Sequence, residues 1–142
     1  MPALYAAPGG ANREEGKTCF LAIRAAGSAF PPEKRISFRD ITDGNPQTLM
    51  LVEANDGNAV NWTKPDDYEL PENPFDELVR KGRSGFIVCM CNGGVYRMSN
   101  EIDADMFRAL SHRDDGKPGS EDEWRNFVEP LRTRDVKLVD VP

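Results

Sequence analysis

The stretch FIVCMCNGGVYRM, residues 86–98, decides the fold class of this chain. It contains two largely apolar runs, Phe86–Cys91 and Gly94–Met98, which are joined at Asn92-Gly93. Both residues of that dipeptide tolerate the positive φ that a type I′ turn requires, so the pattern predicts an antiparallel β-hairpin. The rest of the sequence is therefore interpreted as additions to a hairpin-containing sheet.

Four further segments have the character of β-strands. Thr18–Ile23 alternates so that Cys19, Leu21 and Ile23 share one face. Thr48–Ala54 is apolar on both faces, as expected for a central strand. Two more strands are predicted, one over Val60–Trp62 that pairs back onto Thr48–Ala54 across the turn at 55–58, and an edge strand over Val136–Val141.

Two to three short helices complete the predicted α+β fold. Asp103 is suited to N-cap a helix that ends near Ser111, because its side chain can accept backbone N–H groups of the first turn. A capping box predicts a second helix over Glu121–Glu129. A third short helix is predicted over Phe75–Arg80.

Length and charge exclude several classes of partner. The chain has 142 residues, which allows one domain with a sizeable core. Its formal net charge of −6 at pH 7 argues against nucleic acid and anionic membrane as partners, because both require clustered Lys and Arg. The longest apolar run spans six residues, so no membrane span is expected, and no leader-like segment follows Met1.

The cysteines and the single histidine favour a non-catalytic protein. An odd number of cysteines, Cys19, Cys89 and Cys91, is not typical of a disulfide scaffold, and no second ligand pair accompanies Cys89 and Cys91 to make a zinc site. Buried, reduced thiols are expected instead. His112 falls at the end of a predicted helix, where an imidazolium complements the helix dipole, although spacing alone leaves a Cys–His dyad as an alternative. We expect no enzymatic activity and no cofactor.

Acid-rich turns are weak candidates for calcium binding. Asp40 and Asp43 flank one turn, and Glu53 and Asp56 flank another. Calcium takes several oxygen ligands, which such turns can supply, but neither turn matches the twelve-residue EF-hand pattern. Ordinary solvated turns explain the same residues.

Four ordered segments carry a resemblance to a known family. They are Ile36–Gly44 (ISFRDITDG), Thr48–Ala54 (TLMLVEA), Val60–Asp67 (VNWTKPDD), and Asn92–Val95 (NGGV) ahead of Ile102-Asp103 and Arg108–Leu110. The pattern covers about residues 17–117. It resembles the large, planctomycete-rich family of unknown function whose members begin with a prepilin-type cleavage and methylation segment. Members of that family end with a His, nine residues, then Asp-Gly.

The resemblance implies an exported, pseudopilin-like protein of the cell envelope, with an apolar N-terminal helix followed by a β-rich head. The sheet of this chain is then expected to be pilin-head-like. The positions that correspond to the family motif are Asp43, Gly44, Glu53, Trp62, Pro65, Gly82, Asn92 and Gly93. The family's His falls on Gly82 and its Asp on Asn92, so any site formed by that pair is expected to be lost. The chain itself shows no signal or anchor.

Three regions and two functions follow as expectations. Residues 1–17 form a loose N-terminal arm, 18–117 a pseudopilin-like globular domain, and 118–142 a C-terminal helix-strand extension that packs on it. The first function is a non-catalytic interaction or assembly module, with a protein partner or a second copy. The alternative is a small-ligand or glycan-binding domain in which Trp62, Tyr68 and Tyr96 stack on the ligand beside nearby carboxylates. A flat apolar patch would favour the first, and an open cleft the second.

Overall fold

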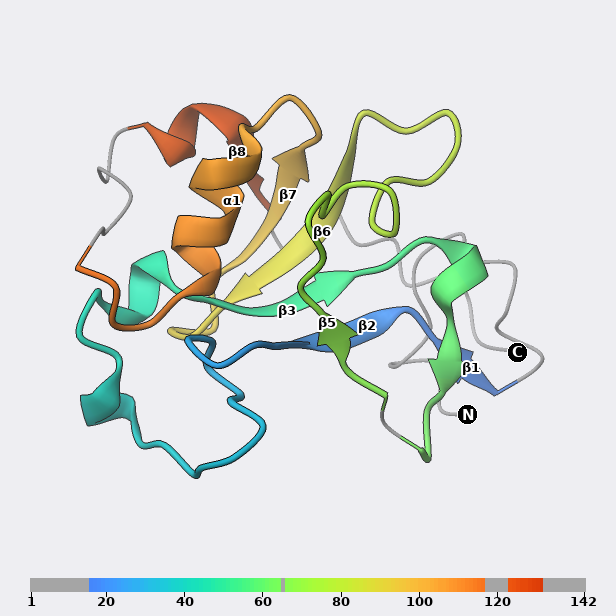
Figure 1. The fold of residues 1–142 in the computed structure, drawn as a ribbon. Coiled ribbons are helices and arrows are strands. Elements are labelled where there is room, and N and C mark those ends of the chain that lie inside the picture. The colour runs from blue at the N-terminus through green and yellow to red at the C-terminus, as the bar shows by residue number, and fades with distance from the viewer. Residues whose placement is uncertain (1–15, 65, 117–122, 132–142) are drawn as a thin grey trace.

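A computed structural model describes residues 16–64, 66–116 and 123–131. Its centre is a six-stranded sheet in the order β5-β2-β3-β6-β7-β8, in which only the β2–β5 pair is parallel (Figure 1). These strands are β2 (Phe20–Arg24), β3 (Leu49–Glu53), β5 (Tyr68–Glu69), β6 (Gly85–Met90), β7 (Val95–Ser99) and β8 (Val128–Pro130). A separate two-stranded sheet pairs β1 (Lys17–Thr18) with β4 (Val60–Asn61).

The helical content of the described residues is smaller than the sequence predicts. They contain one α-helix, α1 (Ala104–Ser111), and 3-10 turns at η2 (Phe38–Asp40), η3 (Asn45–Gln47), η4 (Asp56–Asn58) and η5 (Trp124–Phe127). The predicted α+β class with an antiparallel-rich, hairpin-containing sheet is confirmed. None of the helices in the described part has the length and apolar character of a membrane span.

The hairpin forms as predicted, but with a different turn. β6 and β7 pair from Gly85↔Ser99 to Cys89↔Val95. The N–H of Gly93 bonds the carbonyl of Met90 at 2.9 Å, and among the residues of this turn only Gly93 has a positive φ, of +84°. This is the geometry of a type I turn followed by a left-handed residue, not of a type I′ turn. The Asn92 side chain accepts the Gly94 N–H at 2.9 Å, and Asn92 itself has no positive φ.

One face of the sheet carries the main core. Successive strands place Leu21, Val52 and Val88 in one buried row, because every second side chain of a strand points to the same face. α1 packs Phe107 and Leu110 into this cluster, and Trp124 of η5 joins it. The predicted cap is confirmed, since the Asp103 carboxylate accepts the N–H groups of Asp105 and Met106 at 2.9 and 3.2 Å.

The strand over Val60–Asn61 has a different partner from the one predicted. It pairs with Lys17–Thr18 rather than folding back onto β3. The reason lies at Cys19, which interrupts the predicted strand and whose carbonyl accepts the Ala54 N–H at 2.7 Å. As a result, the chain after β3 runs next to Lys17–Thr18, the residues that precede Cys19, and β4 pairs with them.

The short helix predicted over Phe75–Arg80 is wrong. The segment forms hydrogen-bonded turns, with the N–H groups of Leu78 and Val79 both on the Phe75 carbonyl at 3.2 and 3.1 Å. Asn55 explains why the helix does not continue. Its backbone N–H donates to the Glu77 carbonyl at 2.7 Å, and its side-chain Nδ2 donates to the Asp76 carbonyl at 3.0 Å. Those carbonyls are the acceptors that a helix would need for its next turn.

The helix predicted over Glu121–Glu129 is also wrong in its described part. Residues 124–127 form one 3-10 turn, and Val128–Pro130 then pair with β7 as an edge strand. Burial of Trp124 and the ladder to β7 outweigh the local preference for a helix, and Pro130 disfavours continuation. The edge strand expected over Val136–Val141 and residues 1–15 of the expected N-terminal arm lie outside the described residues.

Candidate functional site

The face of the sheet opposite the main core presents a row of apolar side chains. Ala22, Leu51, Cys89 and Val95 are aligned across four neighbouring strands, β2, β3, β6 and β7. Phe20 and Ile87 flank this row on the same face. We call these six residues the open face.

The open face is only partly covered in the structure. Its side chains are half-buried, and Val95 is 40% exposed. None of the six belongs to either buried hydrophobic cluster of the described residues, whereas α1 and Trp124 belong to the cluster on the opposite face. Met50 of β3 packs against the second cluster, whereas Leu51, Ile87 and Cys89 on β3 and β6 join neither cluster.

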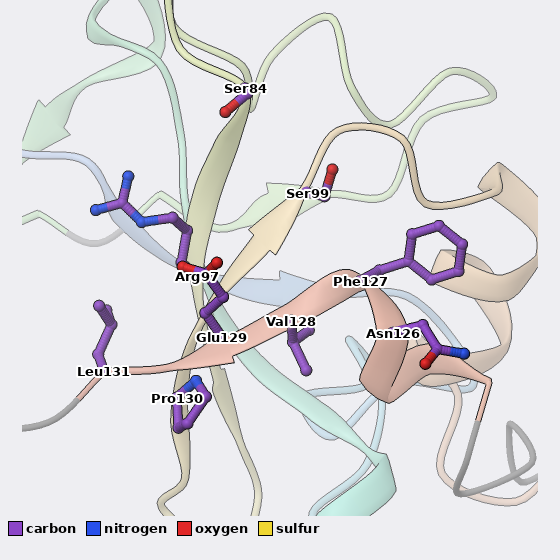
Figure 2. Close-up of a pocket in the computed structure, with 9 residues that line it drawn as sticks. All are labelled: Ser84, Arg97, Ser99, Asn126, Phe127, Val128, Glu129, Pro130 and Leu131. Atoms are coloured by element: carbon purple, nitrogen blue, oxygen red, sulfur yellow. The ribbon is translucent and has the colours of Figure 1, made fainter.

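A hollow borders the open face at the edge of the sheet. It measures about 500 Å³ and lies over β7 and β8 (Figure 2). Arg97 and Glu129, directly opposed across these strands, contribute the charged groups. Figure 2 shows Arg97 extending outward from β7, away from Asn126 and Phe127. The remaining lining residues are Ser84, Ser99, Asn126, Phe127, Val128, Pro130 and Leu131.

The structure does not bring together the three aromatic residues proposed as a stacking surface. Tyr68 is buried, with 2% exposure, and its hydroxyl donates to the Pro74 carbonyl at 2.7 Å. Burial raises the pKa of Tyr68 above its ordinary value. Tyr96 packs edge-on against Trp124, with ring centroids 5.7 Å apart. Trp62 follows β4 and is 39% exposed. Of the three, Trp62 is the most available to a ligand.

Of the four acidic residues proposed as calcium ligands, Glu53 and Asp56 lie close together, but they share an ion pair with Arg80. Arg80 Nη2 lies 3.2 Å from Glu53 Oε1 and 3.4 Å from Asp56 Oδ1. Glu53 is 1% exposed, and its other oxygen accepts the Ile87 N–H at 3.1 Å, where the β3–β6 ladder ends. Arg80 thus neutralises a buried carboxylate that anchors two strands. The sequence signal that could have found this role is the single acid at the end of an apolar strand.

Asp40 and Asp43 bond backbone groups elsewhere. The Ser37 N–H and hydroxyl donate to Asp40 at 2.6 and 2.9 Å, and these bonds lower the pKa of Asp40. Asp43 accepts the N–H groups of Asp115 and Gly116 at 2.9 and 3.1 Å. Across the described ranges, no three His, Cys, Asp or Glu side chains converge as a metal site would require.

Most of the remaining family-motif positions lie in turns, where they determine the backbone conformation. Gly44 and Gly82 have φ of +101° and +81°, a region that residues with a side chain rarely adopt. Asn92 and Gly93 form the hairpin turn described above. Pro65 lies outside the described residues.

Sequence reasoning missed a clamp built around Arg113, which is 3% exposed. Its Nη1 donates to the carbonyls of Ala26 and Ser28 at 3.0 and 2.7 Å, and its own carbonyl accepts the Asp43 N–H at 3.0 Å. The clamp joins three segments far apart in sequence: the chain after β2, the chain before β3 and the end of α1. No local pattern marks such a residue.

The single histidine, His112, packs against Gly27, which lies between the two residues whose carbonyls Arg113 binds. A Cβ added at Gly27 would overlap the His112 ring, and His112 Nδ1 lies 2.8 Å from the Arg108 carbonyl, which holds the ring in place. Gly27→Ala is therefore expected to lower the free energy of unfolding by about 1–3 kcal/mol, through overpacking. Chemical denaturation measures the loss. His112→Ala in the same chain should recover most of it, and an unrecovered loss would contradict this role.

The thiols give a second prediction. Cys19 and Cys91 are buried, Cys89 is half-buried, and burial raises the pKa of all three, that of Cys91 to about 11. Because the thiolate reacts, the labelling rate of native Cys91 should still rise between pH 10 and pH 11, where an ordinary thiol has levelled off. Cys89 should react first of the three, and all should react quickly in denaturant. Mass spectrometry of labelled peptides measures the order, and fast native labelling of Cys91 at pH 7 would contradict it.

One comparison with known proteins identifies a family, and two find no match. No curated protein and no solved structure matches the chain. A family model described as "Protein of unknown function (DUF1559)" matches residues 5–126, which extends beyond the 17–117 covered by the resembling segments and includes Trp124. The chain therefore belongs to this family of proteins of unknown function.

Proposed function

We propose that this chain is a non-catalytic interaction module that binds an apolar helix on its open face. One observation carries the proposal: the row Ala22–Leu51–Cys89–Val95 crosses four strands without joining a buried cluster. A contiguous apolar surface of this kind marks an interaction site. The neighbouring Arg97 and Glu129 supply the polar rim that interfaces typically have.

The choice of a helix as partner follows the pseudopilin-like resemblance. In a pilin-like architecture one face of the head sheet packs on an apolar N-terminal helix. We also propose that the family is planctomycete-rich, has a prepilin-type N-terminus and is exported; at the His and Asp positions of the family's terminal element this chain has Gly82 and Asn92. The helix would come from a partner or from another copy of such a protein.

A second candidate, binding of a small ligand or glycan, draws support from the hollow at the β7–β8 edge. Its hydroxyl and charged groups could bond a polar molecule. The aromatic stacking surface that this function would use is not assembled, because Tyr68 is in the core. The interaction module is therefore the better supported proposal.

Cys89 is a natural reporter for the test, since it lies in the open-face row. The probe is a synthetic 20-residue helix with a leucine stripe and a lysine-rich opposite face. Bound probe should slow the labelling of Cys89 severalfold and leave Cys91, which faces the second buried cluster, unchanged. Leu51→Glu should abolish the protection, because it places a charge in the row.

The matched control is Phe38→Glu, which also replaces an apolar residue by a charge but lies at 69% exposure on a loop outside the open face. Protection of Cys89 should persist in that variant. Labelling of Cys89 that is unaffected by millimolar probe, or equal protection in Leu51→Glu, would overturn the proposal.

A further inference from the structure

Two thiols lie on the same face of β6 and of the residue that continues it. Val88 and Met90 belong to the main core cluster. The alternation of side chains along a strand therefore directs Cys89 and Cys91 to the opposite face of the sheet. The N–H of Cys91 donates to the Thr48 carbonyl at 2.8 Å, so Cys91 extends the pairing of β6 with the chain that leads into β3.

The Cys89 thiol leans along the strand toward Cys91. It donates to the Met90 carbonyl at 3.5 Å, and that carbonyl lies between the two cysteines in the chain. Same-face neighbours in a strand are about 6.6 Å apart along its axis, and this lean brings the sulfur atoms closer than that. Burial raises the pKa of Cys91 to about 11, and the nearby Cys89 thiol adds to the rise. The two thiols are thus close enough to act on one bound group.

A β-bulge adds a thioether to the same face. The pairing of β3 with β6 shifts by one residue between Leu49 and Leu51, which makes Met50 the extra residue of β3. Leu49 lies in the main core, whereas Met50 packs against the second buried cluster, which contains Cys91. A bulge of this kind re-aims a side chain and is often found next to functional sites. Two thiols and one thioether therefore gather on one side of β3 and β6.

The surroundings of these sulfur atoms are apolar. The second buried cluster is completed by residues of the β2–β3 loop, Ala29, Ile36 and Ile41. Cys91 is 7% exposed, while Cys89 is half-buried on the open face and gives a route of entry from solvent. Ca²⁺ and Mg²⁺ take oxygen ligands, which this environment does not favour. Soft thiolate and thioether ligands instead select soft metal ions such as Cu(I).

We propose that Cys89, Cys91 and Met50 together bind one monovalent copper ion, Cu(I). Two or three sulfur ligands satisfy this ion. Zinc normally takes four ligands, and among the residues that the structure describes no third His, Cys, Asp or Glu joins the two thiols. On binding, each S–H bond is exchanged for an S–Cu bond, both protons pass to solvent and copper keeps the oxidation state +1. The inference goes beyond the helix-binding proposal and does not depend on it.

The test titrates the reduced full chain, without oxygen, with Cu(I) held by the coloured chelator bicinchoninate. The chain should remove one Cu(I) per molecule from the chelator and show the ultraviolet charge-transfer absorption of thiolate-bound copper. Cys89→Ser and Cys91→Ser should each lower the affinity on the order of 100-fold or more, since even the loss of a group behind the ligands costs about 10- to 100-fold. Met50→Leu, which conserves volume, should lower it severalfold.

The matched control is Cys19→Ser, which also removes a buried thiol. Cys19 lies at the other end of β3, where its carbonyl accepts the Ala54 N–H, and its thiol is 3.9 Å from Asp56. The Cys19→Ser chain should bind Cu(I) as the unaltered chain does. The unaltered chain gives a second readout that requires no substitution in the core. Its bound Cu(I) should slow the alkylation of Cys89 and Cys91 and leave the rate at Cys19 unchanged, as measured by mass spectrometry.

Three results would overturn the inference. The first is a chain that removes no Cu(I) from the chelator. The second is binding that survives Cys89→Ser and Cys91→Ser or is lost in Cys19→Ser. The third is an unchanged affinity in Met50→Leu, which would remove the thioether from the site. The helix probe is assayed without copper, so failure of the proposed function and failure of this inference are distinguishable.

Discussion

Arg80→Met is expected to lower the free energy of unfolding by about 3–5 kcal/mol, because it leaves a buried carboxylate without its counter-charge. Glu53 is 1% exposed and Arg80 is 8% exposed, so water cannot replace the guanidinium. The same arginine lies 3.4 Å from Asp56, and its loss brings two carboxylates together without a cation between them. Arg83 lies 3.9 Å from Glu53 and is more exposed than Arg80, so it should compensate only in part. For a domain of this size such a loss lowers the melting temperature by roughly 10 °C or more.

Chemical denaturation with a fluorescence readout measures this effect. The matched control is Lys81→Met, the adjacent cation, which is exposed and should change stability by no more than about 0.5 kcal/mol. Arg80→Lys should recover part of the loss, since it restores the charge but not the planar donor group. An Arg80→Met chain as stable as the Lys81→Met chain would show that the Glu53–Arg80 contact is not needed.

Trp124→Ala is expected to destabilise the fold by about 3–5 kcal/mol, the range for truncating a buried large aromatic residue. Trp124 is 1% exposed and packs edge-on against Tyr96, with Arg125 positioned 5.3 Å from its ring centroid. It joins the same core cluster as α1, so its removal leaves a cavity between the sheet and the chain that covers it. The segment that carries it is therefore expected to stabilise the domain.

Two measurements separate this expectation from a passive C-terminal segment. Thermal unfolding of Phe127→Ala, the half-buried neighbour, provides the control and should show a clearly smaller loss. Truncation after Gly119 removes Trp124 together with β8, and should increase binding of an apolar dye and self-association. If the truncated chain stays monomeric, binds no dye and melts as the full chain does, the segment is dispensable.

The sequence predicted the local features correctly where neighbouring residues determine them. The hairpin at Asn92-Gly93 and the helix capped by Asp103 both depend on groups a few residues apart, which a turn or a cap brings together whatever the rest of the fold does. The turn type was wrong because the strands close at Met90 and Gly94, one residue earlier than a two-residue turn at Asn92-Gly93 requires, and this longer loop needs a positive φ only at Gly93.

The candidate site could be predicted only in part. Apolar residues on both faces of β3 and β6 were visible in the sequence, and they supply the open face. The sequence could not show that Tyr68 is buried or that Glu53 and Asp56 share one arginine, because those contacts join residues that only the sheet topology brings together.

Tertiary contacts decided the rest of the fold. Asn55 donates hydrogen bonds to two carbonyls of the segment predicted as a helix at 75–80. The end of the predicted C-terminal helix is instead a strand, because it pairs with β7. By itself, the sequence determined an acidic α+β domain with a β-hairpin, one capped helix and strands apolar on both faces. Only the tertiary structure decided which face of the sheet α1 and Trp124 cover, because that choice depends on hydrogen bonds and packing between residues far apart in the chain.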